Sequence, residues 1–272
     1  MTTPAPDILD HYASGYERER LRAGPSQLEL ARTRELLGRH LPPPPAVILD
    51  VGGGPGTYAR WLASQGYDVH LVDPVPIHIE QALQDDADPP LASAVVGDAR
   101  HLGVADASAD VALLMGPLYH LTERTDRMLA LREAARVVRP GGLVLAVGIT
   151  RFASLLDGLS SGFLDDPEFV AIVERDLRSG QHRNSGNHPG YFTTAYFHHP
   201  DELREEIVEA GLTAIDTVAI EGPGRWVPQD VDAWWDDPVR RERLLDAVRA
   251  VEREPSLIGL GPHMMVIARR AP

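Results

Sequence analysis

The sequence has 272 residues, 43% of them hydrophobic, which is enough for one large domain or for one domain with a small cap. The absence of cysteine excludes disulfides, thiolate nucleophiles and cysteine-bound metals, and the absence of lysine excludes a Walker lysine, Schiff-base chemistry and the Tyr-x-x-x-Lys pair of short-chain dehydrogenases. A formal net charge of −14 disfavours a nucleic-acid partner, because phosphate binding requires a basic surface.

The N-terminal segment is polar with periodic leucines, and this pattern predicts helix over residues 7–41. Four prolines at 42–45 end the helix and stiffen the entry to the next element. The first residues lack the basic-then-apolar order of a signal peptide, and no apolar run approaches the ~20 residues of a membrane-spanning helix. We therefore expect a cytoplasmic protein with no membrane partner.

Residues 47–58 predict a buried strand, a tight turn and the start of a helix. Gly52, Gly54 and Gly56 form G-x-G-x-G two positions after Asp50. A dinucleotide-binding loop would require glycine where Thr57 stands. A strand–turn–helix of this kind brings backbone N–H groups against a nucleotide-like ligand, although a glycine-rich turn needed only for packing is the simpler alternative.

Further strands end in acidic or glycine-rich turns. Residues 67–73 predict a strand that ends at Asp73, whose carboxylate would accept hydrogen bonds from ribose hydroxyls. Residues 94–99 place Asp98 where it would accept from an adenine amine. A fourth strand over 110–117 is followed by a helix over 129–138, a turn over 139–142 and a fifth strand over 143–147. Each acidic residue alone could be a helix cap, but together they lie on the edge where open α/β sheets bind ligands.

As a set, the motifs Asp50–Gly56, Leu71–Asp73, Gly97–Ala99 and Arg139–Gly142 resemble those of class I S-adenosylmethionine-dependent methyltransferases. The resemblance implies an α/β fold: a Rossmann-like, seven-stranded, mostly parallel sheet with helices on both faces and helical insertions. Its last strand would be antiparallel, between the fifth and the sixth. It also implies S-adenosyl-L-methionine as cofactor. We expect no metal, because the spacing of the histidines matches no metal-binding template. The residues expected to bind the cofactor are Tyr16, Arg20, Asp50, Gly52, Gly53, Gly54, Asp73, Pro74, Asp98, Ala99, Met115 and Gly116.

The second half of the chain departs from simple strand–helix alternation. It predicts helices over 152–159 and 167–177, a polar loop over 180–191, a helix over 201–210 and a strand over 213–221. A tryptophan-rich stretch, a helix over 239–252 and a last strand over 263–269 follow. We expect residues 1–45 to form a helical lid. Residues 46–272 would form the methyltransferase domain, with acceptor-binding insertions at 151–200 and 222–262.

Candidate acceptor-side residues follow the fourth and fifth strands. His120 is the first candidate for a general base, with Tyr119 in the same pocket, although His120 could instead cap or pack under a helix. His182 is a further catalytic candidate, and the alternative is a solvent-exposed loop without a role. Arg151 could pair with an acceptor carboxylate or make an ordinary ion pair. The expected acceptor-binding residues are Arg151, Arg183, Asn184 and Tyr191.

The fourth-strand motif Gly116–Leu121 differs from the Asn/Asp-Pro-Pro-Tyr of enzymes that methylate nucleic-acid bases or glutamine. We therefore predict methyl transfer to an oxygen or nitrogen of a small-molecule acceptor. A peptide or protein methyltransferase, a nicotinamide-dependent oxidoreductase and a non-catalytic binding protein remain as alternatives.

Overall fold

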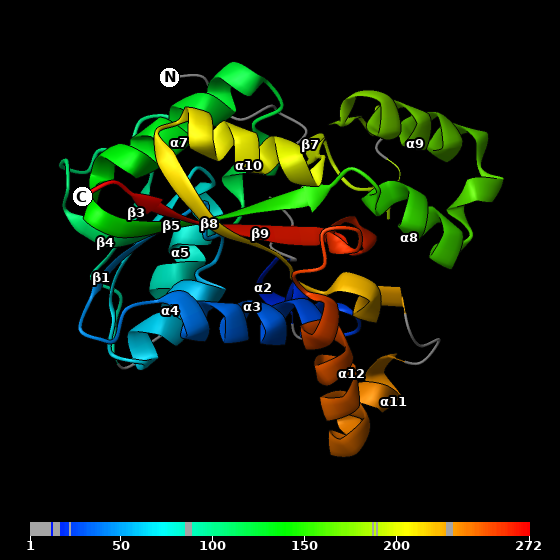
Figure 1. Ribbon diagram of the computed structural model, residues 1–272, viewed down its shortest axis with the longest axis horizontal. Helices are drawn as coiled ribbons and strands as arrows, with labels where there is room; N and C mark the ends of the chain where they lie inside the picture. The colour runs from blue at the N-terminus through cyan, green and yellow to red at the C-terminus, as the bar shows by residue number, and fades with distance from the viewer. Residues whose placement is uncertain are drawn as a thin grey trace.

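The computed structural model describes residues 12, 17–21, 23–84, 89–186, 188, 190–226 and 231–272. A central sheet runs through the molecule with helices on both of its faces (Figure 1). Tyr16, one of the residues expected to bind the cofactor, lies outside the described residues.

The sheet contains nine strands among the described residues. Seven of them form its main part, in which only β9 (His263–Arg270), the last in the chain, runs antiparallel to its neighbours. Their order across the sheet is β3 (Ser93–Val96), β2 (Asp68–Asp73), β1 (Val47–Val51), β4 (Ala109–Leu114), β5 (Val138–Thr150), β9 and β8 (Leu212–Ala219). The insertion of β9 between β5 and β8 confirms the predicted topology.

The central strands β1, β4 and the second half of β5 are buried on both faces, which explains their continuous apolar runs. One face is covered by α3 (Ser26–His40), α4 (Thr57–Ser64) and α5 (Pro76–Gln84), through residues such as Leu36 and Leu62. The other face is covered by α7 (Arg124–Val137) and α10 (Pro200–Glu209), through residues such as Leu131 and Leu203. This three-layer packing fixes the carboxyl ends of β1 to β5 along one edge of the sheet.

The region after β5 is more ordered than the sequence indicated. The helices α8 (Ala153–Ser161) and α9 (Pro167–Ser179) form as predicted. The expected polar loop contains a short strand, β6 (Gln181–His182), which pairs with β7 (Ala195–His198). In turn β7 pairs with the end of β5, so the insertion continues the sheet.

The predicted turn at residues 139–142 is also part of β5. Gly141 has φ of +79°, and the register between β4 and β5 shifts between Ala109 and Val111. The strand therefore passes through an irregularity instead of ending in a turn.

The C-terminal helices α11 (Val231–Asp236) and α12 (Pro238–Val251) extend away from the sheet (Figure 1). Only α12 was predicted. It packs through Leu244 and Val248 on Leu28 of α3, and Arg249 Nε lies 2.9 Å from Glu35 Oε1. The remaining short elements are α2 (Glu17–Arg20), α6 (Pro117–His120), η1 (Phe163–Asp165), η2 (Gly222–Trp226) and η3 (Ile258–Leu260). Among the described helices, none is long and apolar enough to cross a membrane.

Candidate active site

A cavity of about 370 Å³ lies at the carboxyl ends of β1, β2, β3 and β4. Its size falls in the range of small-molecule sites. Most of the residues expected to bind the cofactor line it: Arg20, Gly52, Gly53, Gly54, Asp73, Pro74, Asp98, Ala99, Met115 and Gly116. Tyr119 and His120 line the same cavity. Residues from five separate segments of the chain therefore meet in one space.

The glycines after β1 are required for different reasons. Gly52 has φ of +68°, and a Cβ there would lie 2.8 Å from Pro117 Cδ, so the loops after β1 and β4 approach too closely for a side chain. A Cβ at Gly116 would lie 2.5 Å from the carbonyl oxygen of Gly52. Gly54 has φ of +58°, but a Cβ there would meet no atom nearer than 3.8 Å. Gly54 thus leaves open space on the cavity side.

Asp50 does not line the cavity, contrary to expectation. It is fully buried behind the glycine loop, where a Cβ on Gly53 would collide with its carboxylate. Burial and the neighbouring charge of Asp73 raise the pKa of Asp50 to about 7, while the backbone amide of Ala59 opposes the shift. Asp50 supports the loop from behind, and Gly53 has to be glycine to fit over it.

Asp73 fixes the glycine loop to the end of β2. Its Oδ2 accepts from the Gly54 amide at 2.8 Å, and its Oδ1 accepts from the Val75 amide at 2.9 Å. His78 Nδ1 also lies 2.9 Å from Oδ1. Nε2 of His78 is buried without a hydrogen-bond partner in the described part of the chain, and His78 lines the cavity. The sequence analysis did not identify His78, although it follows Asp73 by little more than one helical turn.

Asp98 is held by an arginine that was also not identified. Arg100 donates to Asp98 through Nε at 3.0 Å and Nη2 at 2.6 Å, and its Nη1 lies 2.8 Å from Asp126 Oδ2. Although burial opposes the shift, these hydrogen bonds lower the pKa of Asp98. The carboxylate at this end of the cavity is therefore ionised at neutral pH.

The wall after β4 carries the aromatic candidates. His120 Nε2 lies 2.7 Å from the hydroxyl of Tyr12, which also lines the cavity. Tyr119 donates to the carbonyl oxygen of Met115 at 3.1 Å, and burial raises its pKa. Phe192 stacks near the ring of His120, with 6.0 Å between the centroids. Tyr119 is thus a neutral hydrogen-bond donor beside an aromatic wall.

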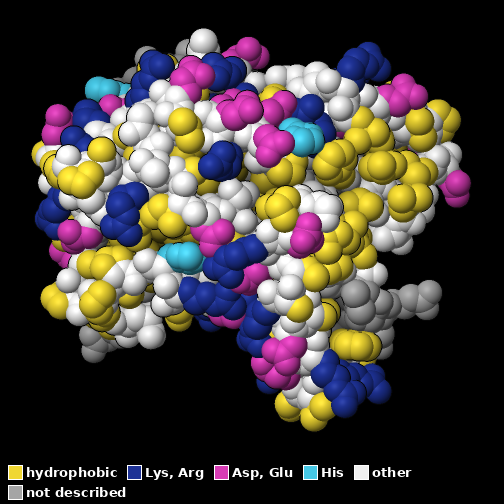
Figure 2. All heavy atoms as spheres, in the orientation of Figure 1, with side chains coloured by type: hydrophobic (Ala, Val, Ile, Leu, Met, Phe, Trp, Pro, Cys, Tyr) yellow, Lys and Arg dark blue, Asp and Glu magenta, His cyan; other side chains and the backbone are white. Residues whose placement is uncertain are grey.

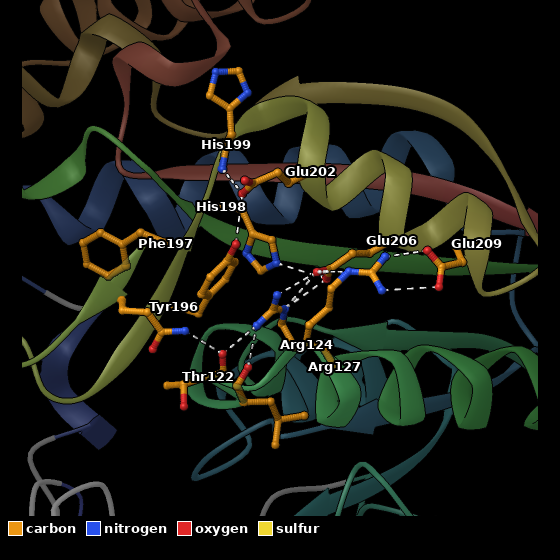
Figure 3. A network of polar contacts seen from close by, with 12 residues as sticks. Thr122, Arg124, Arg127, Tyr196, Phe197, His198, His199, Glu202, Glu206 and Glu209 are labelled. Atoms are coloured by element: carbon orange, nitrogen blue, oxygen red, sulfur yellow. Dashed lines mark hydrogen bonds and ion pairs between the residues drawn. The ribbon is translucent and has the colours of Figure 1, made fainter. Parts of the chain in front are cut away.

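A network of polar contacts holds the segment that follows His120 in this wall (Figure 3). Arg127 donates to the carbonyl oxygens of Leu121 and Thr122 at 3.1 and 2.9 Å, and to Glu206 at 2.7 Å. Its guanidinium lies 3.6 Å from the centre of the Tyr196 ring. Burial opposes ionisation of Glu206, but hydrogen bonds from His198 and Arg127 lower its pKa to about 2. The segment that follows His120 is thereby held in one position.

His182 does not reach the cavity, which corrects its expected catalytic position. Its side chain is buried, with Nδ1 at 2.8 Å from Asp176 Oδ2 and Nε2 at 3.1 Å from the carbonyl oxygen of Phe192. Both ring nitrogens are thus engaged within the first insertion. His182 joins α9 to the strand that follows it.

The expected acceptor-binding residues also lie outside the cavity lining. Arg151 donates to the Phe197 carbonyl at 2.7 Å and pairs with Glu202, which is the ion-pair alternative. The other three bond within the insertion: Arg183 to the His182 carbonyl, Asn184 to the carbonyls of His188 and Tyr191, and Tyr191 to Asp166. These side chains hold the insertion together.

A charged cluster on the N-terminal side was not identified from the sequence. Arg20 pairs with Glu17 at 2.8 Å and with Glu29 at 2.7 Å, and all three line the cavity. Glu29 also lies in a group with Glu221 and His263, whose ligand atoms are all within 4.8 Å of one another. Because these residues come from distant parts of the chain, the only local signal was that Glu221 and His263 flank strands.

The sheet is Rossmann-like, and its glycine loop and acidic strand ends surround one cavity. This arrangement is typical of proteins that bind a nucleotide-derived cofactor. Residues 49–146 match a sequence model described as a methyltransferase domain. An uncharacterized methyltransferase of Mycobacterium tuberculosis is 36% identical over 104 residues, 38% of this chain and 40% of the relative. A malonyl-[acyl-carrier protein] O-methyltransferase of Dechloromonas aromatica is 32% identical over 174 residues, 63% of this chain and 53% of the relative.

Solved structures share the fold at low identity. An S-adenosylmethionine-dependent methyltransferase of Mesorhizobium loti has a TM-score of 0.59 and 16% identity, and the match covers 89% of this chain and 100% of that one. Magnesium protoporphyrin IX methyltransferase of Synechocystis, with bound S-adenosylhomocysteine, has a TM-score of 0.57 and 13% identity, covering 97% and 98%.

Together, these findings identify residues 49–146 as a methyltransferase domain within a chain that has the fold of known methyltransferases, and they indicate S-adenosylmethionine as its cofactor. The nicotinamide alternative is left without support. The match spans about 40% of the length of the first curated relatives. The cavity fits the cofactor, because Gly54 leaves open space and His78 Nε2 has no hydrogen-bond partner within the described residues.

Proposed function

We propose that this protein transfers the methyl group of S-adenosylmethionine to an oxygen or nitrogen of a small-molecule acceptor. The observation that carries the proposal is the meeting of four consecutive strand ends, with Gly54, Asp73, Asp98 and Gly116, around one cavity of about 370 Å³. The bound cofactor would supply an electrophilic methyl group on a sulfonium centre.

On the cofactor side, Asp73 and His78 would receive the ribose hydroxyls, while Asp98 and Ala99 would lie beside the adenine. Arg20 faces the cavity and would attract the cofactor's carboxylate, since a guanidinium matches a carboxylate in charge and geometry. The remaining contacts would come from the glycine loop and the end of β4, through Gly52, Gly53, Gly54, Pro74, Met115 and Gly116. Tyr16 stays a proposal from the sequence alone.

On the acceptor side, Tyr119 and His120 would contact the acceptor. Methyl transfer is an in-line displacement, so the protein has to hold the acceptor near attack distance and to exclude water. The buried phenol of Tyr119 would donate a hydrogen bond, and Phe192 would supply apolar surface. The residues that hold the first insertion against this wall would act indirectly. They are His182, Arg151, Arg183, Asn184 and Tyr191.

The arrangement of segments supports the division of roles. Residues 1–45 would act as a lid, because Tyr12, Glu17 and Arg20 line the cavity from this segment. The insertions at 151–200 and 222–262 would complete the acceptor pocket, the first of them through Phe192. On the face shown in Figure 2, arginines are interspersed with acidic side chains, and this pattern favours a small molecule over a nucleic acid. A basic peptide is the second candidate, favoured by the charge of −14.

Calorimetric titration with S-adenosylmethionine, S-adenosylhomocysteine and NADH tests the cofactor assignment. We expect micromolar binding of the two adenosyl ligands only. Gly54→Val should abolish this binding, because the new side chain enters the cavity at a positive φ. Gly103→Val is the matched control, since a Cβ there meets no atom within 4 Å and lies outside the cavity. Equal binding by the two variants would refute the site. Screening acceptors by release of S-adenosylhomocysteine then tests the activity.

A further inference from the structure

The buried carboxylate of Glu221 and the partly buried imidazole of His263 form a pair at the edge of the sheet that carries the cavity. Glu221 follows β8, and His263 begins β9 opposite Ile149, near the carboxyl end of β5. Nδ1 of His263 lies 2.6 Å from Oε1 of Glu221, and the His263 amide donates to Oε2 at 3.2 Å. Both oxygens of the carboxylate therefore hold the same histidine.

This contact fixes which nitrogen of His263 can accept a proton. A carboxylate accepts from Nδ1–H, so the neutral ring carries its lone pair on Nε2. Within the described residues, Nε2 makes no hydrogen bond. Glu221 has 2% of its side chain exposed and His263 has 17%. The ring of His263 is therefore partly exposed, while the carboxylate that holds it is buried.

Glu29 connects this pair to the cavity. It lines the cavity, and its carboxylate lies within 4.8 Å of the ligand atoms of Glu221 and His263. The charged groups that act on His263 are Glu221, Glu29 and Arg20, and Arg225 acts on Glu29. Two carboxylates near the imidazole favour a positive charge on it, and one nearby guanidinium opposes it. An imidazolium formed during a reaction would therefore be stabilised.

We propose that Nε2 of His263 is the base that takes the proton of the methyl acceptor, and that Glu221 positions it. The inference rests on the proposed function and narrows the acceptor to compounds that carry an ionisable O–H or N–H. Glu221 and His263 lie outside the cavity lining, so the acceptor would extend from the aromatic wall of Tyr119 and His120 past Glu29 to reach His263.

Methyl transfer with His263 as the base conserves both protons and electrons. A lone pair on the acceptor oxygen or nitrogen forms the new bond to the methyl carbon, and the carbon–sulfur bond breaks with its electrons passing to sulfur. The acceptor's X–H electrons remain on the heteroatom, and its proton passes to Nε2. S-adenosylhomocysteine, methylated acceptor and His263 imidazolium result, and the imidazolium returns its proton to solvent after product release.

His120 is the other histidine candidate for a base, and its geometry differs. Its Nε2 already lies 2.7 Å from the Tyr12 hydroxyl. His263 has the buried carboxylate that orients a catalytic imidazole. Although burial opposes the shift, Glu221 and Glu29 raise the pKa of His263, which brings the base closer to a working neutral pH.

The first test needs no acceptor. NMR of ¹⁵N-histidine-labelled protein saturated with S-adenosylhomocysteine measures the tautomer and pKa of His263. We expect the Nδ1–H tautomer, and a pKa that falls in Glu221→Gln. His188, whose Nε2 lies 3.1 Å from Glu168 on the surface, is the control whose signals should not move. An Nε2–H tautomer, or a His263 pKa unchanged in Glu221→Gln, overturns the proposal.

The second test uses turnover on phenols, carboxylic acids and amines. His263→Asn should lower kcat about 100-fold or more, the usual contribution of a general base, while S-adenosylhomocysteine affinity stays within about 3-fold. Glu221→Gln should shift the acid limb of the kcat/KM–pH profile to lower pH, and Glu221→Asp should restore part of the rate.

Undiminished kcat in His263→Asn overturns the proposal. Loss of activity with EDTA, restored by a divalent ion, overturns it in favour of a metal at Glu29, Glu221 and His263. Failure of S-adenosylhomocysteine to bind wild-type protein refutes the proposed function instead.

Discussion

The hydroxyl of Tyr12 lies 2.7 Å from Nε2 of His120, across a sequence separation of 108 residues. The two rings meet edge to face with 5.3 Å between their centroids, and the ring centroids of Tyr12 and His78 lie 5.4 Å apart. Tyr12 thus joins the N-terminal segment to the ends of two strand–helix units. The N-terminal segment is part of the cavity wall in this structure.

Tyr12→Phe should weaken S-adenosylhomocysteine binding about 5-fold, because one hydrogen bond that holds the segment over the cavity is lost. Stopped-flow measurement should show the change mainly in the dissociation rate. Tyr67→Phe is the matched control, since that hydroxyl donates to the Pro42 carbonyl away from the cavity. Equal effects of the two substitutions would mean that Tyr12 does not restrain the ligand.

Asp73→Asn should lower the affinity for S-adenosylmethionine at least 10-fold. The amide cannot accept from the Gly54 and Val75 backbone as two carboxylate oxygens do, and it gives the ribose a poorer acceptor. Asp110→Asn is the control, because Asp110 also accepts a backbone amide, that of Val47, but at the opposite end of the sheet. Calorimetry should show normal binding by Asp110→Asn, and unchanged binding by Asp73→Asn would contradict the ribose assignment.

Asp50→Asn should stabilise the protein at high pH. The pKa of Asp50 is about 7 in the folded state and about 4 in the unfolded state, so the folded state binds more protons between these values. The contribution of Asp50 to stability is therefore lost as pH rises from about 4 to about 7. Relative to wild type, the variant should gain on the order of 2 kcal/mol between pH 5 and pH 8, since each pKa unit is worth about 1.4 kcal/mol. Urea unfolding at several pH values measures this gain, and a pH-independent difference would contradict it.

Arg127→Met should destabilise the protein by about 3–5 kcal/mol at pH 7, because it leaves Glu206 buried without its guanidinium. Since the pKa of Glu206 is depressed to about 2, its stabilising contribution is complete above about pH 4 and is lost as pH falls towards 2. The cost of the substitution should shrink accordingly in acid. Arg124→Met is the control, because its pair with Glu209 is exposed and screened by solvent, and its contact with Glu206 is longer, at 3.8 Å (Figure 3). Similar losses for both variants in denaturant unfolding would disprove this account.

The cofactor half of the site was predictable because its signals are local. Gly52, Asp73 and Asp98 each follow a strand, and consecutive parallel strands bring their carboxyl ends to one edge. Alternating apolar runs and turns therefore placed them together without knowledge of tertiary contacts. Asp50 belonged to the same pattern, but its orientation behind Gly53 depends on the exact turn of the backbone.

The acceptor half was less predictable because its contacts are long-range. The polar composition of residues 180–191 indicated a loop, yet Asp176 binds His182 and lets it be buried. The pairing of β6 with β7 adds hydrogen bonds that no periodicity over so few residues reveals. Glu221 and His263 meet only because β9 runs antiparallel beside β8.

The insertion of β9 also sets an order of assembly. Residues 47–150 supply β1 to β5 and the whole glycine loop, so the nucleotide half of the sheet can form while the rest of the chain is still being synthesised. Among the described strands, β8 pairs only with β9, and it has to wait for residues 263–270 to leave the ribosome. A nascent chain would thus contain the whole glycine loop before it can complete the Glu221–His263 pair.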